Sequence, residues 1–158
     1  MEHLLRAKLS WTLIYFYLFL GGKGIISGFC LVMFASADLG GVVANVADSR
    51  AGLATISDDG SLILVQLTLD FKPNIPQEAE RVVQCNGRVF CLDDERVHRV
   101  WLPNEESPGL AMSRAFGDYC LKDFGLISVP QVTRRQITVR DQFIVLASDG
   151  SKAWERTS

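Results

Sequence analysis

From residue 40 onward, short apolar segments alternate with turn signals, and this texture restricts the chain to folds built on antiparallel sheet. Val42–Arg50 and Ala51–Thr55 have the composition of a strand pair or one bent strand. Thr133–Val139 alternates polar and apolar residues, which is typical of a strand with one solvated face. Phe143–Ala147 is apolar throughout, which indicates a strand buried on both faces.

Turn and helix signals divide these strands. Asp59-Gly60 stands between two apolar stretches and predicts a hairpin. The stretch "NIPQEAERVVQCNG" predicts the one clear helix, with Asn74 as its cap and a proline in its first turn. Glu78 favours the positive end of that helix, and Asn86-Gly87 predicts its left-handed stop. Its apolar face is expected to carry Ala79, Val82 and Val83. Many short strands with segregated helices predict an α+β fold on antiparallel sheet.

Charge and cysteine usage narrow the function classes. The 158 residues carry a net charge of −2, so there is no basic field of the kind that nucleic-acid binding requires. The four cysteines form no Cys-x-x-Cys pair, and the sequence has only two histidines that could complete a zinc site. Reduced thiols are therefore favoured over a zinc site, and disulfides stay open. The cysteines are Cys30, Cys85, Cys91 and Cys120.

The N-terminal segment is apolar and allows three interpretations. Leu9–Leu20 follows Arg6 and Lys8, but it is shorter than the roughly 20 residues that a membrane-spanning helix needs. The three interpretations of Leu9–Leu20 are a buried core segment, a signal or membrane anchor, and sequence foreign to a domain that begins later.

Three segments end or bend at an aspartate beside small residues: "VADSRAG" with Asp48, "SRAFGD" with Asp118 and "LASDG" with Asp149. Asp48 and Asp149 each follow an apolar strand, and strand ends can meet at one edge of a sheet. Clustered carboxylates suit Mg²⁺ or Mn²⁺, which can activate water and hold a phosphoryl group. Each motif alone is more often a simple turn.

The order of the strings "VANVADSRAGLAT", "SPGLAMSRAFGDYCLKDFGLISVP" and "QFIVLASDG" is shared with a known family. Residues 27–150 resemble the metal-dependent protein serine/threonine phosphatases of type 2C, most closely the plant branch. The resemblance is densest from Gln66 to Gly150.

This resemblance implies a partial αββα sandwich: two antiparallel β-sheets flanked by helices, with divalent ions at one edge. A metal-bound water would attack the phosphate of phosphoserine or phosphothreonine. The resemblance makes Asp149 a ligand of the catalytic metals and Asp48 an accessory ligand. Residues 71–109 resemble a flap beside the active site, and Arg114 and Asp118 match structural positions.

Several family features are absent from the printed sequence. The motif Asp-Gly-His-Gly-Gly, which supplies a shared metal ligand, does not occur, and Ala153 stands where another ligand would be. Ala47 replaces a glycine, at a cost on the order of 1 kcal/mol if the position needs positive φ. Leu92 stands where a hormone co-receptor branch has tryptophan. The chain is interpreted as a truncated member, with residues 1–26 and 151–158 divergent.

Two main hypotheses follow. The first is a Mg²⁺- or Mn²⁺-dependent serine/threonine phosphatase relative whose activity is impaired in this chain. The second is a non-catalytic module that competes with intact relatives for phosphoproteins or kinases. A cytoplasmic or nuclear location is expected from the resemblance, and membrane association through residues 9–20 is a third possibility.

Overall fold

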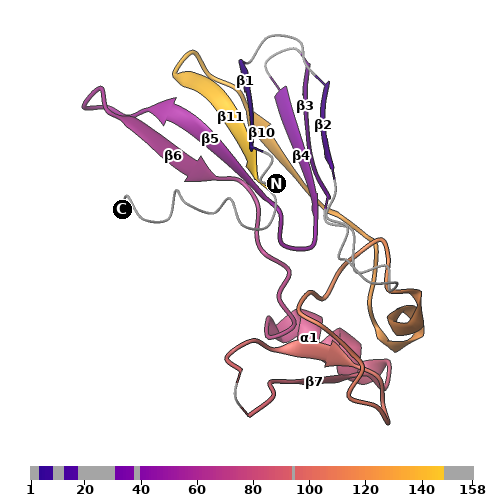
Figure 1. The fold of residues 1–158 in the computed structure, drawn as a ribbon. Coiled ribbons are helices and arrows are strands. Elements are labelled where there is room, and N and C mark those ends of the chain that lie inside the picture. Colours follow the sequence, from indigo (N-terminus) through magenta and orange to yellow (C-terminus); the bar gives the residue numbers. More distant parts are fainter. Residues whose placement is uncertain (1–3, 9–12, 18–30, 38–39, 94, 148–158) are drawn as a thin grey trace.

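The structure, a computed structural model, describes residues 4–8, 13–17, 31–37, 40–93 and 95–147. Two regions make up the described chain (Figure 1). One is a β-sandwich of two four-stranded sheets, and the other is a smaller insert module, residues 71–127, placed between strands β6 and β10 of the sandwich. The expected α+β architecture on antiparallel sheet is confirmed.

The first sheet has the strand order β1-β11-β5-β6, and every neighbouring pair is antiparallel. β11 lies between β1 and β5, so the apolar segment predicted as a buried strand is central in its sheet. Ile144 and Leu146 are fully buried, whereas Phe143 and Val145 are half-buried, so complete burial holds for one face only. The strands are β1 (Leu4–Lys8), β11 (Asp141–Ala147), β5 (Arg50–Ile56) and β6 (Leu62–Gln66).

The second sheet has the order β10-β4-β3-β2, again antiparallel throughout. Its strands are β10 (Gln131–Gln136), β4 (Gly40–Val46), β3 (Leu31–Ala37) and β2 (Leu13–Tyr17). β4 and β5 therefore belong to different sheets, and the prediction of a strand pair or bent strand was wrong. The chain crosses from one sheet to the other within residues 47–49. β4 pairs with β3 and β10, and β5 pairs with β6 and β11, so neither strand pairs with the other.

A shared core joins the two sheets. Its buried side chains come from β4, β5 and β11: Val43, Ala51, Leu53, Ile144 and Leu146. The predicted hairpin between β5 and β6 is confirmed, and Gly60 supplies the left-handed residue of its turn with φ 84°. Packing of apolar side chains between the sheets is the main stabilising term for such a sandwich.

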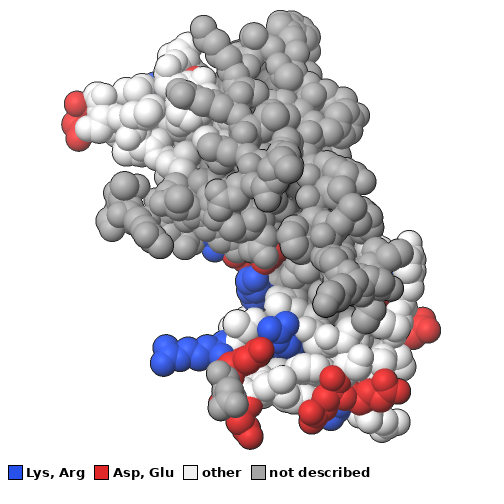
Figure 2. All heavy atoms as spheres, viewed as in Figure 1, with Lys and Arg blue, Asp and Glu red and all other residues white. Residues whose placement is uncertain are grey.

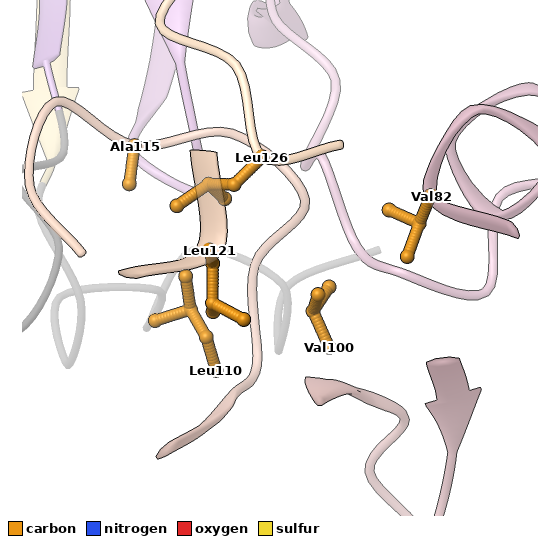
Figure 3. Close-up of a cluster of buried hydrophobic side chains, with 6 residues drawn as sticks. All are labelled: Val82, Val100, Leu110, Ala115, Leu121 and Leu126. Atoms are coloured by element: carbon orange, nitrogen blue, oxygen red, sulfur yellow. The ribbon is translucent and has the colours of Figure 1, made fainter. Parts of the chain in front are cut away.

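The insert module has its own apolar cluster (Figure 3). Val82 reaches into it from the helix, and the other members come from the small sheet and the segment around η1. The cluster comprises Val82, Val100, Leu110, Ala115, Leu121 and Leu126. The elements are α1 (Pro76–Gln84), β7 (Arg88–Phe90), β8 (Arg99–Trp101), β9 (Pro108–Leu110) and the 3₁₀ helix η1 (Tyr119–Phe124).

Helix α1 departs from its predicted pattern at the cap and the buried face. Ile75, in extended conformation, occupies the cap position without a side-chain hydrogen bond, so the prediction of Asn74 as cap was wrong. Val83 is 59% exposed, and the buried residues are Glu78 and Val82. The stop is as predicted: Asn86 has φ 60°.

The apolar segment Leu9–Leu20 falls partly within the described residues. β2 takes up residues 13–17 as a strand, while residues 9–12 and 18–20 lie outside the described part. Within the described ranges, no helix is long and apolar enough to cross a bilayer.

Candidate functional site

Asp48 lies at the crossing between the two sheets, one residue beyond the left-handed turn that follows β4. It is 5% exposed, and its Oδ2 accepts a hydrogen bond of 2.6 Å from Lys72 Nζ. A charge-assisted bond of this length to a buried carboxylate is among the stronger polar contacts in a protein. The accessory ligand expected at this position therefore has an ammonium group as a neighbour.

A second ion pair runs beside the first. Arg50 donates from Nε and Nη2 to the two carboxylate oxygens of Asp70, each at 2.7 Å. The hydrogen bond to Asp70 raises the pKa of Arg50 despite the opposing effect of burial. Asp48, Arg50, Asp70 and Lys72 together form what we call the junction cluster. The cluster ties the sheet crossing to the start of the insert module.

The backbone at the crossing is held by its own hydrogen bonds. Ala47 has φ 76°, so the positive φ considered for this position is present, and an alanine adopts it. Its carbonyl oxygen accepts from the Phe71 N–H at 3.0 Å. The Asn45 side chain donates to the Leu69 carbonyl at 2.9 Å. These bonds fix the position from which Asp48 projects.

The described residues do not by themselves fit a divalent metal. Among them, no group of three or more histidine, cysteine, aspartate or glutamate residues is arranged to hold an ion. Mg²⁺ and Mn²⁺ need several oxygen ligands in fixed geometry, and one carboxylate already bonded to an ammonium does not supply them. Asp149, the other predicted ligand, lies outside the described residues.

The insert module contains a buried charged network centred on Glu78. Arg114 donates to both carboxylate oxygens of Glu78, at 2.6 and 3.0 Å, and its guanidinium lies 3.9 Å from the Phe71 ring centroid. Arg81 and Ser113 donate to the same carboxylate at 2.7 and 2.6 Å. The structural role assigned to Arg114 is supported by these contacts and stays a prediction.

The network sets the ionisation of Glu78. Burial raises its pKa, but the hydrogen bonds from Arg114, Arg81 and Ser113 outweigh that effect and bring the pKa to about 2. Sequence reasoning missed this residue, because Glu78 in a first helical turn looked like a partner of the helix dipole. No local signal pointed to Arg114, which is 36 positions away.

Asp118 lies in the insert module, at the start of η1. It precedes η1 with φ 54°, is 5% exposed, and its carbonyl oxygen accepts from the Leu121 N–H at 2.9 Å. Its carboxylate is not part of any three-member ligand group in the described ranges. The structural assignment of Asp118 likewise stays a prediction.

A comparison with protein families decides the identity of this arrangement. The family model described as Protein phosphatase 2C matches residues 23–151. The chain belongs to the protein phosphatase 2C family.

Relatives and solved structures agree with that assignment. "Probable protein phosphatase 2C 34" of Arabidopsis thaliana is 73% identical over 109 residues, which cover 68% of this chain and 30% of that protein. "Probable protein phosphatase 2C 48" of Oryza sativa subsp. japonica is 65% identical over 122 residues, covering 74% and 34%. The crystal structure of serine-threonine phosphatase 2C from Toxoplasma gondii superposes with TM-score 0.74 at 28% identity, covering 83% and 43%.

Both the family resemblance and the sandwich architecture predicted from sequence are thus confirmed. The chain spans about a third of the length of the curated relatives named above. Activity, substrate and partners of the protein phosphatase 2C domain are therefore matters of proposal for this chain.

Proposed function

We propose that a complete domain of this kind hydrolyses phosphoserine and phosphothreonine in proteins. The 158-residue chain itself would do so poorly or not at all. Mg²⁺ or Mn²⁺ would be the cofactor, with Asp149 and Asp48 as the ligands that this chain can contribute. The contact that carries the second half of the proposal is the 2.6 Å bond between Lys72 Nζ and Asp48 Oδ2.

That bond works against metal binding for a simple electrostatic reason. A divalent ion at Asp48 would have to displace the ammonium of Lys72 and find its remaining oxygen ligands elsewhere. The printed sequence has no Asp-Gly-His-Gly-Gly string, and Ala153 replaces a further acidic position. Two aspartates are too few to arrange a pair of metals around an attacking water.

The proposal is tested with the purified 158-residue chain and a phosphothreonine peptide. We expect no phosphate release above buffer with Mn²⁺, and no change on addition of EDTA. Hydrolysis that needs Mn²⁺, stops with EDTA and is lost in Asp149→Asn would refute the impairment. Asp123→Asn is the matched control, because Asp123 is an exposed aspartate of η1.

The second candidate function is a binding module that competes with intact relatives for phosphoproteins or kinases. Support comes from the insert module, which has its own buried cluster and its own ion network. It also presents exposed apolar side chains: Tyr119, Val83 and Val97 are 75%, 59% and 43% exposed. Exposed aromatic residues are enriched where proteins meet.

Competition separates this candidate from the first. Partners captured by an intact relative should be displaced by an excess of the 158-residue chain, and less so by Tyr119→Ala. If the chain captures none of the relative's partners, the module hypothesis is wrong.

Fractionation of cells separates the proposed cytoplasmic or nuclear location from membrane association through residues 9–20.

Nucleic-acid binding gains no support from the described part of the face drawn in Figure 2. Figure 2 shows acidic and basic side chains interspersed over the described part of this face of the insert module, rather than one extended basic area. The net charge of −2 points the same way.

A further inference from the structure

Cys91 and His98 face each other across the mouth of the loop between β7 and β8. The antiparallel pairing ends with Phe90 opposite Arg99, and Cys91 and His98 are the residues that follow and precede this pair along the chain. Directly opposed residues of such a pair have their side chains within contact distance. The Cys91 Sγ lies 3.2 Å from the His98 Nδ1.

The loop around this pair is held by three further contacts. The Glu95 N–H donates to the Leu92 carbonyl at 2.9 Å, and Arg99 Nε donates to the Glu95 carboxylate at 2.7 Å. Trp101 Nε1 donates to the Phe90 carbonyl at 3.1 Å. The thiol and the imidazole are therefore positioned by sheet register and by the folded loop.

Cys91 differs from the other described cysteines in this contact. Cys91 and Cys85 are partly exposed and Cys120 is exposed. Of these three, Cys91 is the one whose sulfur lies within hydrogen-bond distance of a histidine. A thiol reacts as its thiolate, and an adjacent imidazole that accepts the proton promotes that form.

We propose that Cys91 is a redox-modification site that hydroperoxides oxidise, with His98 as the acceptor of its proton. With His98 protonated on Nε2, the thiol donates to Nδ1 and transfers its proton there. The thiolate sulfur then attacks one peroxide oxygen, forming an S–O bond as the O–O bond breaks. The departing oxygen takes the proton from His98. This gives a sulfenic acid on Cys91 together with water from hydrogen peroxide, or with the corresponding alcohol from an organic hydroperoxide.

A metal site at the same pair has less support, because the described residues offer no third ligand beside it. The proposed oxidation is independent of phosphate hydrolysis, so its test uses the thiol itself. Trypsin separates the three cysteines onto different peptides, Val82–Arg88, Val89–Arg96 and Ala115–Lys122. The reduced 158-residue chain is exposed to hydrogen peroxide, trapped with dimedone, digested and analysed by mass spectrometry.

We expect Cys91 to be labelled at least about ten-fold faster than Cys120, although Cys120 is the more exposed thiol. His98→Asn should lower the Cys91 rate to the level of Cys120 and leave the Cys120 rate unchanged. Val97→Ala is the matched control in the same loop and should leave both rates as they are. In denaturing urea, the difference between the two thiols should disappear.

Two results would overturn the proposal. One is a Cys91 rate at or below that of Cys120 in the folded wild-type chain, a comparison that needs no variant. The other is an unchanged Cys91 rate in His98→Asn whose circular dichroism and thermal midpoint match the wild type.

Discussion

The β-sandwich and the insert module differ in how their cores are assembled. The sandwich core is made of neutral apolar side chains from strands that lie far apart in the sequence, such as Leu53 on β5 and Ile144 on β11. The insert module draws on residues within 71–127 and combines its apolar cluster with a buried ionised carboxylate, Glu78. Loss of one charge should therefore damage the module far more than the sandwich.

The outer edge of the sandwich shows the converse weakness. β6 is an edge strand in the described sheet, and Leu62, Ile63 and Leu64 are 57%, 44% and 39% exposed. An exposed apolar edge strand favours association with other chains. The sandwich depends on covering its apolar surface, whereas the insert module depends on satisfying its buried charges.

Glu78→Ala should have the largest effect, a loss of roughly 3–5 kcal/mol in the free energy of unfolding. Two partly buried arginines, Arg81 and Arg114, would lose their shared counter-charge. Urea unfolding measures the loss, and hydrogen exchange locates it. Amides of residues 76–127 should lose protection, while those of β4, β5 and β11 keep theirs.

Glu80→Ala, on the exposed side of the same helix, is the control and should stay within about 0.5 kcal/mol of the wild type. Equal loss of protection in sandwich and module would contradict the distinction drawn between the two cores.

The same network predicts a pH dependence. The pKa of Glu78 falls from 4.5 to about 2 on folding, so its stabilisation is complete above about pH 4.5 and declines toward pH 2. The difference in unfolding free energy between wild type and Glu78→Gln should shrink by on the order of 3 kcal/mol over this window. Unfolding series at pH 7, 4.5 and 2.5 test it. A constant difference would show that Glu78 is not ionised in the folded chain.

Two glycines compare the regions by steric fit. A Cβ on Gly125, in the module with φ 92°, would lie 2.7 Å from the Val82 Cα, whereas one on Gly60, in the sandwich hairpin with φ 84°, would meet nothing within 4 Å. Both alanine variants carry backbone strain, but only Gly125→Ala adds overlap with backbone. Gly125→Ala should lose about 2 kcal/mol more than Gly60→Ala in thermal or urea unfolding. Equal losses would mean that the helix shifts freely.

Ala47→Gly should have the smallest effect, a gain of about 0.5 kcal/mol in unfolding free energy. Relief of the positive φ of 76° is partly offset by the lost buried methyl group. Asn86→Gly is the control, since asparagine tolerates its φ of 60° with little strain. Destabilisation by Ala47→Gly would show that the methyl contact outweighs the strain.

Features with local causes were predictable from the sequence. The Asp59-Gly60 hairpin and the left-handed stop at Asn86 follow from the conformational preferences of those residues, and the structure has both. The family resemblance supplied the sandwich, which is confirmed. It also singled out Asp48 as an accessory ligand, and that role stays a prediction.

Features that depend on residues far apart in the sequence were not predictable from it. Val83 was expected on the buried face of the helix, but it is exposed and Glu78 is buried instead. Glu78 is buried because it binds Arg114, 36 residues away in the sequence. Lys72 as the partner of Asp48 is 24 residues away and leaves no periodic signal. In the sequence, the crossing between β4 and β5 looks like a bend in one strand. The structure separates them because β4 pairs with β10 in one sheet and β5 pairs with β11 in the other.

The strand order has a consequence for the sequence of events during synthesis. β11 pairs with β5 on one side and with β1 on the other, where Leu4 stands opposite Ala147. Long-range pairings of this kind slow folding, because loop closure precedes any gain from the contact. Residues 71–127 precede β11 along the chain, so they leave the ribosome before the strand that lies between β1 and β5. A nascent chain should thus hold a formed module beside an open sandwich, the state in which chaperones would find it.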